Sequence, residues 1–191
     1  MALPQYPLPY GVRQVQITKF TDATATAYSG SSINLPYMQT LTFAEAEEFQ
    51  ELRGDDQLIT SHGKGCQVNW EIEAGGFSFE AWAAVAGGAV TTGGVTPNTY
   101  KEYSKWTTDA TDSSKFTRPF FKAEGRAISD SGGDFHVTIF RCRANDDLKG
   151  ELKDGEFWTT GIKGIGLGSW VPADLNLSYK FRQNETPVVI S

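Results

Sequence analysis

Residues 66–76 read Cys-Gln-Val-Asn-Trp-Glu-Ile-Glu-Ala-Gly-Gly, and this stretch decides the fold class. Apolar and polar side chains alternate along it, a period of two that is typical of a β-strand with one buried face. Val68, Trp70 and Ile72 are therefore expected to face a core. The polar set is expected to face away from that core and consists of Gln67, Asn69, Glu71 and Glu73.

A short helix is expected directly after this strand. Ser78 can accept a hydrogen bond as the N-cap residue, and Gly87 can end the helix with a positive φ. Phe79, Trp82 and Ala86 follow helical spacing. A helix of about two turns is not stable alone in water, so these three side chains are the candidates for packing it. We expect Phe79 and Trp82 to lie across the end of a sheet.

Residues 38–62 precede the strand and are expected to form a long hairpin. Gly54-Asp55-Asp56 has turn chemistry, because Gly accepts a positive φ and Asp can bond its own backbone. A second β-turn is expected at Gly63-Lys64-Gly65.

The first half of that hairpin, Met38 to Leu52, allows two interpretations. The residues from Ala44 onward include good helix formers, which favours a helix. Against a helix, Glu47 and Glu51 would be like charges at i and i+4 without a basic partner. We predict a strand and keep the helix as the alternative.

Further strands are expected wherever apolar and polar residues alternate between turn residues. Asp22–Ser32 and Val90–Asn98 are small and polar and are expected to be loops, and Asp130–Gly133 is expected to be a hairpin tip. Pro4, Pro7 and Pro9 predict an extended N-terminal arm at 1–11; a C-terminal tail is expected at 182–191. The candidate strands are Val12–Phe20, Tyr100–Thr107, Phe116–Ile128, Phe135–Ala144, Phe157–Leu167 and Leu175–Phe181.

Composition agrees with a β fold in one domain. The chain has 191 residues, 20 of them Gly, and 13% of its residues are aromatic. Such a composition favours many short strands joined by tight turns over a helical bundle. We predict a single, mainly β domain at 1–191: a two-sheet β-sandwich with one short helix, a long hairpin and an extended N-terminal arm.

The charge distribution disfavours nucleic-acid binding. The net charge is −6, and residues 38–80 hold nine acids against Arg53 and Lys64. A sequence-independent grip on phosphates needs clustered Lys and Arg instead. The first ten residues lack the pattern of a signal peptide, and no apolar run is long enough for a membrane anchor. Synthesis in a reducing cytoplasm is therefore expected.

No catalytic, metal or cofactor site is expected. The candidate zinc ligands would be His62 and Cys66 with His136 and Cys142, but the last two would lie about 20 Å apart on one strand. Cys66 shares the parity of the buried positions and is expected to be a buried structural thiol. No nucleophile elbow or phosphate-binding loop is found, and we expect no enzyme activity.

The order of hairpin, Glu-flanked strand, Gly-Gly and short Gly-terminated helix resembles the major tail tube protein family of long-tailed, non-contractile bacteriophages. The resemblance covers roughly the middle three quarters of the chain. It continues through Arg118–Phe121, Gly132–Phe140, Asp154–Phe157 and Ile162–Gly166.

The resemblance implies a structural virion protein of the phage tail, made in the cytoplasm of the bacterial host. In that family, copies form hexameric rings with a continuous inner β-barrel, and the rings stack into a tube through which DNA enters the host cell. The implied partners are further copies of the chain, the tape measure, tail tip and tail terminator proteins, and DNA that passes without specific binding.

The resemblance also gives two sets of residues a role. The polar face of the Cys66–Glu73 strand would line the lumen, so Gln67, Asn69, Glu71 and Glu73 are the lumen-facing candidates. The hairpin would make contacts between rings through Glu45, Glu47, Glu48, Glu51, Arg53, Asp55 and Asp56.

A second function remains open from the residues alone. Five Trp and seven Tyr allow a soluble β-sandwich module that binds a carbohydrate or a protein ligand through exposed aromatic rings. A tube protein should form rings or long tubes under the electron microscope, whereas a binding module should remain a discrete particle.

Overall fold

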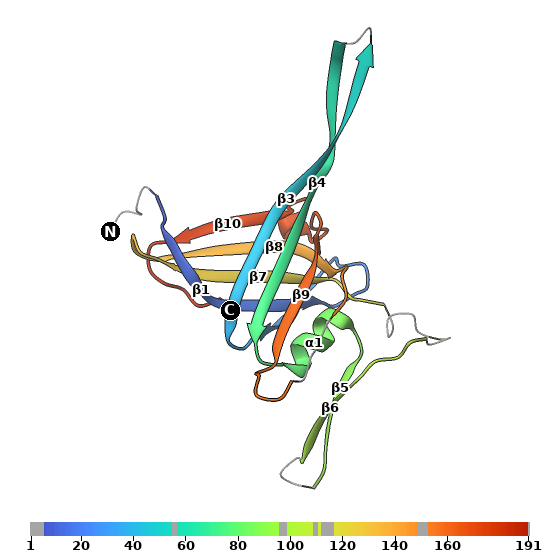
Figure 1. Ribbon diagram of the computed structural model, residues 1–191, viewed down its shortest axis with the longest axis vertical. Helices are drawn as coiled ribbons and strands as arrows, with labels where there is room; N and C mark the ends of the chain where they lie inside the picture. The colour runs from blue at the N-terminus through green and yellow to red at the C-terminus, as the bar shows by residue number, and fades with distance from the viewer. Residues whose placement is uncertain are drawn as a thin grey trace.

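A computed structural model describes residues 6–54, 57–95, 99–108, 111, 117–148 and 153–190. Within these residues the protein is mainly β, with ten strands, one short α-helix and one 3-10 turn, so the predicted fold class is confirmed. The strand between Met38 and Leu52 is also confirmed, and it is longer than expected. The long hairpin gives the molecule its long axis (Figure 1).

The elements follow one another along the chain with few long connections. The strands before the helix are β1 (Pro9–Phe20), β2 (Tyr28–Asn34), β3 (Met38–Gly54) and β4 (Gln57–Gly75). The helix is α1 (Phe79–Ala86), and the 3-10 turn is η2 (Pro172–Asp174). The remaining strands are β5 (Ala89–Gly93), β6 (Tyr100–Ser104), β7 (Phe121–Ser129), β8 (Asp134–Ala144), β9 (Thr159–Gly166) and β10 (Tyr179–Asn184).

Eight strands form one antiparallel sheet in the order β2-β1-β7-β8-β9-β4-β3, with β10 also paired to β8. Strand β8 changes partner along its length: Asp134–Ile139 pair with β10, and Cys142–Ala144 pair with β9. Arg141 lies at this change with a positive φ of 39°. The sheet folds over here, so that β3, β4 and β9 cross the layer of β1, β7, β8 and β10 (Figure 1).

The sandwich therefore consists of two layers joined by hydrogen bonds through β8 and β9. The second sheet is the separate β5–β6 ribbon and not the second layer. Buried side chains from both layers meet in one core, which also includes the inner face of α1. Trp70 of β4 packs edge-on against Phe121 of β7, with ring centroids 5.5 Å apart. The core members on β4 are Val68, Trp70 and Ile72, the three that the alternation predicts.

Helix α1 has the predicted caps. The Ser78 hydroxyl accepts a hydrogen bond from the Ala81 N–H at 3.3 Å, and Gly87 ends the helix with φ 80°. The fully buried face is made of small residues, among them Ala81 and Ala84. Ala86 is buried as well, whereas Phe79 and Trp82 are only half-buried and contact the ring of Phe77.

Two expected loops contain strands. β2 lies within and beyond Asp22–Ser32, and β5 lies within Val90–Asn98 and one residue before it. Both are polar, so neither shows the alternation from which strands were predicted. Cross-strand contacts hold β2: the Thr18 and Ser32 hydroxyls lie 2.9 Å apart, and the Lys122 ammonium lies 4.6 Å from the Tyr28 ring centroid.

The β-turn expected at Gly63-Lys64-Gly65 is wrong. β4 runs through these residues, and the register moves from Glu47↔Cys66 to Phe49↔Gly63, so β4 holds one more residue than β3. Gly65 has φ 102°. The glycine that suggested a turn therefore permits a β-bulge, which bends and twists the hairpin.

Both ends of the chain are partly strand. β1 begins at Pro9, within the expected arm 1–11, and β10 ends at Asn184, within the expected tail 182–191. The remaining tail is anchored. Ile190 is buried, and its carbonyl accepts a hydrogen bond from the Gln16 amide at 2.9 Å.

The Asp134 carboxylate ties this tail to β8. It is fully buried and accepts hydrogen bonds from the Val188 N–H at 2.6 Å, the Asn184 amide at 2.7 Å and the Arg126 Nε at 2.8 Å; His136 Nε2 lies 3.0 Å away. Burial alone would raise the pKa of Asp134. The hydrogen bonds outweigh burial and lower the pKa to about 2.

We predict that the close approach of β9 to the core tolerates no side chain at Gly164. A Cβ there would overlap the Arg143 carbonyl oxygen and the Trp70 ring, so Gly164→Ala should lower the free energy of unfolding by about 1–3 kcal/mol. Gly161→Ala on the same strand is the control, because a Cβ there meets nothing within 4 Å. Urea unfolding of both variants measures the difference; equal stabilities would contradict the packing.

We predict that Asp134 makes stability depend on pH in acid. Because its pKa in the folded chain is about 2, below the ordinary 3.8, the carboxylate stabilises the fold above pH 4 and this contribution is lost as the pH falls toward 2. Asp134→Asn should remove about 2 kcal/mol at pH 7 and flatten that acid dependence. Chemical unfolding from pH 2 to 7 measures both; Asp130→Asn, at the exposed hairpin tip, should leave the profile unchanged.

Candidate assembly surfaces

The outer face of β4 carries the polar residues that the alternation predicts. Asn69 and Glu73 are exposed, and Gln67 and Glu71 are half-buried. The Gln67 amide donates a hydrogen bond to the Asn69 side chain at 3.1 Å. All four therefore lie on one solvated surface of the β3–β4–β9 layer, with β9 on one side and β3 on the other.

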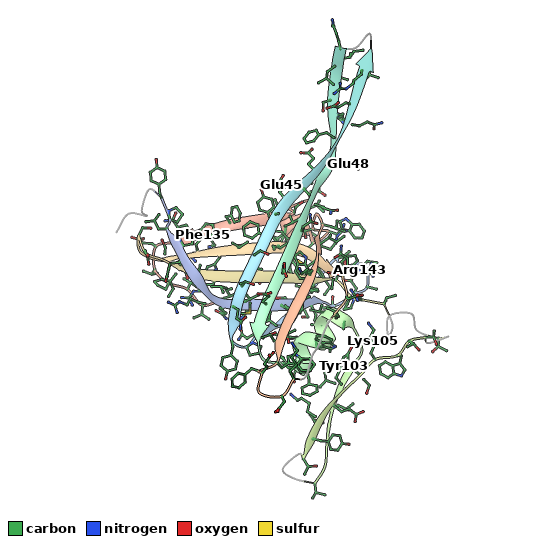
Figure 2. The ribbon with its side chains drawn as sticks, viewed as in Figure 1. Glu45, Glu48, Tyr103, Lys105, Phe135 and Arg143 are labelled. Atoms are coloured by element: carbon green, nitrogen blue, oxygen red, sulfur yellow. The ribbon has the colours of Figure 1, made fainter. Side chains whose placement is uncertain are left out.

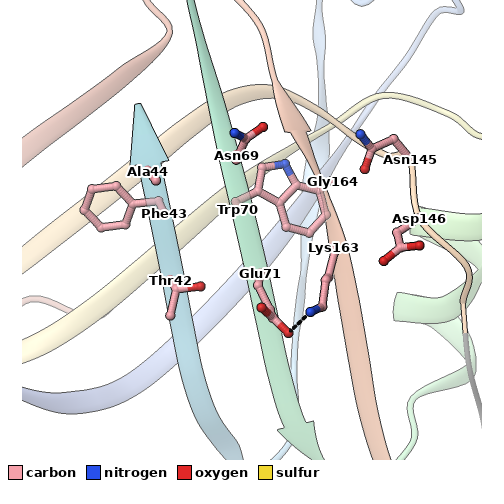
Figure 3. A pocket seen from close by; sticks show the side chains of 10 residues that line it. All are labelled: Thr42, Phe43, Ala44, Asn69, Trp70, Glu71, Asn145, Asp146, Lys163 and Gly164. Carbon is pink, nitrogen blue, oxygen red and sulfur yellow. Dashed lines mark ion pairs between the residues drawn. The ribbon is translucent and has the colours of Figure 1, made fainter. Parts of the chain in front are cut away.

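Lys163 of β9 changes the charge of this surface. Glu71 is paired with Lys163 in the β4–β9 register, and the Lys163 ammonium lies 2.8 Å from the Glu71 carboxylate (Figure 3). The hydrogen bond that the Lys163 ammonium donates to the Glu71 carboxylate raises the pKa of Lys163. Glu73 accepts a hydrogen bond from the Thr40 hydroxyl at 3.2 Å and has no ion pair among the described residues. Among the described residues, the outer face of β4 therefore presents one carboxylate in an ion pair, Glu71, and one without an ion pair, Glu73.

A shallow hollow lies over this pair and is open to solvent. Its rim includes Asn69, Asn145 and Asp146, and Trp70 and Gly164 form part of its lining (Figure 3). Amide, carboxylate and ammonium groups meet here from β4, β9 and the segment that follows β8. The hollow thus offers a mixed polar surface.

The layers leave open backbone edges. Among the described strands, β3 pairs only with β4, β2 only with β1, and β10 only with β8. On its other side, β9 pairs with β8 only over Gly164–Gly166. Each open edge presents unpaired N–H and C=O groups that another strand can bind.

The outer part of the β3–β4 hairpin projects beyond both layers (Figure 1). β3 has 17 residues, so it spans about 56 Å at ~3.3 Å per residue. Four large apolar side chains on the projecting part are more than half exposed: Phe49, Leu52, Leu58 and Ile59. Figure 1 shows no other described element beside this part of the hairpin, so the four side chains form an exposed apolar segment.

The acidic residues of the hairpin occupy different environments. Glu45 lies at the base, where it accepts a hydrogen bond from the Tyr179 hydroxyl of β10 at 2.6 Å. Glu51 forms an exposed ion pair with Arg53 at 2.8 Å. Glu47 and Glu48 are exposed, and Figure 2 shows Glu48 where the hairpin leaves the layers. Asp55 and Asp56 lie outside the described residues.

The Cys and His residues do not converge. Among the described residues, no group of three or more His, Cys, Asp or Glu side chains could hold a metal ion. His136 contacts Asp134, and burial raises the pKa of the Cys142 thiol. Cys66 is half-buried, less than expected, because it lies at the bulge; burial, followed by a hydrogen bond to Glu45, raises its pKa.

Within the described part of the chain, no helix has both the length and the apolar character needed to cross a membrane.

No protein-family model and no curated protein matches the chain. Among solved structures, the chain is similar to a chain of the baseplate of the anti-feeding prophage, determined by cryo-EM and six-fold symmetrised. The two are 8% identical, the match covers 96% of this chain and 98% of the other, and the TM-score is 0.44. A likeness of this strength says nothing of function by itself.

Proposed function

We propose that the chain is a structural protein of a phage tail, and that its copies assemble into stacked rings that form the tail tube. The rings would enclose a channel for DNA, with the outer face of β4 toward the lumen. The projecting hairpin is the main support for this proposal, because its exposed apolar side chains have no evident role in a free monomer.

A two-stranded ribbon is marginally stable in water without a third strand or a packed face. The outer part of the β3–β4 hairpin has neither within the described residues, and four large apolar side chains lie exposed on it. Burial of those side chains against another chain would stabilise both the hairpin and the assembly. A second copy of the chain is a partner that is always present.

The open edges support assembly from identical copies. The β3–β4–β9 layer ends in β3 on one side and in the free part of β9 on the other. Pairing of these edges between neighbours would close the layers into a barrel and remove the exposed backbone groups. Its wall would then consist of the mixed polar face that includes Glu71, Glu73 and Lys163.

A lumen of this composition suits the passage of DNA. Glu73 repels phosphate, and Lys163 is neutralised by Glu71 at 2.8 Å. A wall without free cations offers phosphates no site of strong attraction. Repetition around a ring would extend the same surface over the whole circumference.

We predict that exposed apolar residues of the hairpin are needed for assembly and not for folding. Leu52→Asp with Leu58→Asp should leave the thermal midpoint within a few degrees, because these side chains are 56% and 54% exposed, but should abolish rings or tubes in electron micrographs. Leu175→Asp is the control, since Leu175 is 57% exposed outside the hairpin. Wild-type protein that stays monomeric at high concentration would sink the proposal and favour a binding module.

We predict that a positive lumen slows DNA. The test is a triple variant with Glu71→Lys, Glu73→Lys and Lys163→Glu. The ion pair between positions 71 and 163 is kept with its charges exchanged, and position 73 gains a positive charge without an ion pair. Virions with these tails should eject DNA more slowly, most strongly at low salt, because new phosphate contacts form. The control is Glu102→Lys on β6, which carries the same change at an exposed site. Normal ejection from well-formed tails would show that this face does not line the channel.

A further inference from the structure

We propose that a cationic and aromatic pocket beside α1 receives the acidic hairpin of a second copy of the chain, so that copies stack head to tail. This inference rests on the proposed function and names the surface that receives the hairpin. The pocket, of about 470 Å³, lies between the end of β1, the end of α1 and the segment that leads into β7.

Three cations line the pocket: Lys19, Arg118 and Arg143. Arg118 Nη1 donates to the carbonyl oxygens of Ala144 at 3.1 Å and of Asp146, and Arg143 Nε donates to the Arg118 carbonyl at 2.9 Å. Carbonyl groups fix both guanidinium groups but do not neutralise them. Among the described residues, none of the three cations forms an ion pair with a carboxylate.

The one acid in the lining does not compensate these charges. The Asp22 carboxylate is occupied by the Thr24 hydroxyl at 2.6 Å and the Thr26 hydroxyl at 2.9 Å, both on its own loop. The neighbouring Lys105 shows the effect of the local charge, because burial and then the positive charge of Arg118 lower its pKa. The pocket is thus a positive site in a chain of net charge −6.

Aromatic rings extend the cationic wall into a stack of four side chains: Arg143, Phe120, Arg141 and Trp170. The Arg143 guanidinium carbon lies 4.6 Å from the Phe120 centroid, and that of Arg141 lies 5.6 Å from Phe120 and 3.7 Å from Trp170. Stacking uses the faces of the guanidinium groups and leaves the N–H edges for an acceptor.

Arg141 lies at the end of this stack, outside the pocket lining, and has unsatisfied N–H groups in the single chain. The residue is 8% exposed, and its Nε and Nη1 atoms are buried without a hydrogen-bond partner. A buried guanidinium without hydrogen-bond partners is costly, and Arg141 is stabilised instead by the two rings on which it stacks, Phe120 and Trp170. Arg141 also has a φ of 39°, so the backbone is strained at this position.

The hairpin is the anion that fits this site. Its segment Glu45–Asp56 holds six acids against Arg53 alone, and Phe49 among them is 61% exposed. An aromatic ring flanked by carboxylates complements rings flanked by guanidinium groups. Arg143 and Lys105 lie near α1 and away from the hairpin, where Glu48 lies, so the contact joins two copies and not two parts of one (Figure 2).

The test is an exchange of charges in the full chain. Arg143→Glu alone and Glu47→Lys with Glu48→Lys alone should each reduce the assembly rate, followed by light scattering and electron microscopy, by about tenfold or more. The combination of the two should restore it to within about threefold of wild type. Arg13→Glu, at an exposed position of β1, is the matched control and should assemble normally.

A further pair of variants distinguishes a loss of assembly from a folding defect. If Arg143→Glu lowers the thermal midpoint, Arg143→Gln and Glu47→Gln replace the reversals, and each should slow assembly by a smaller factor that shrinks as salt is added. A combined variant that assembles no better than the single ones would overturn the inference while tubes of the wild type leave the proposed function standing. Absence of wild-type assembly would overturn both.

The same pocket could instead bind nucleic-acid phosphate, and the experiment separates the two ligands. Fluorescence anisotropy with a short labelled DNA duplex at low salt should show weak binding that Arg143→Glu does not change. Loss of DNA binding in Arg143→Glu, together with normal assembly, would assign the pocket to phosphate and overturn the inference.

Discussion

The contact between Trp70 and the opposite layer is the constraint on which the rest of the structure depends. Trp70 packs against Phe121 with ring centroids 5.5 Å apart, and it reaches this position because Gly164 on the adjacent strand has no Cβ. The layers are two parts of one sheet, so their packing requires the sheet to fold over. The sheet folds over at Arg141, where the pairing partner of β8 changes from β10 to β9. A backbone outlier costs about 1–3 kcal/mol, which the burial of a few large side chains offsets.

The sequence predicts those elements whose burial pattern is local. β4 was predictable because its two faces meet different environments residue by residue, and α1 because both of its caps are encoded within ten residues. β2 and β5 could not be predicted, because their residues are mostly small and polar. Their pairing depends on residues of other strands, as in the contact between Thr18 of β1 and Ser32 of β2. Gly65 was misread for a related reason: a positive φ serves a turn and a bulge equally well.

The candidate surfaces show the same limit more strongly. The outward set on β4 follows from parity alone. Its charge, however, depends on Lys163, which lies 92 residues after Glu71 in the sequence (163 − 71) and opposite it in the β4–β9 register. The hairpin acids form one group in sequence, yet Glu45 contacts Tyr179 of β10 and Glu51 contacts Arg53. The arginine–aromatic stack draws on residues 120 to 170, which no spacing rule brings together.

Charge and open edges impose opposite demands on such a chain. Unpaired edges and an exposed apolar hairpin favour association with any available strand, whereas a net charge of −6 makes copies repel one another in most orientations. In the stacking proposed above, the cations beside α1 would face the acids of the hairpin, and charge would favour that orientation over others. The same orientation would also fix the position of the open edge of β3, because β3 forms one half of the hairpin. On this proposal, the uneven charge of the chain would discourage disordered aggregation and favour an ordered arrangement in which its apolar surfaces are covered.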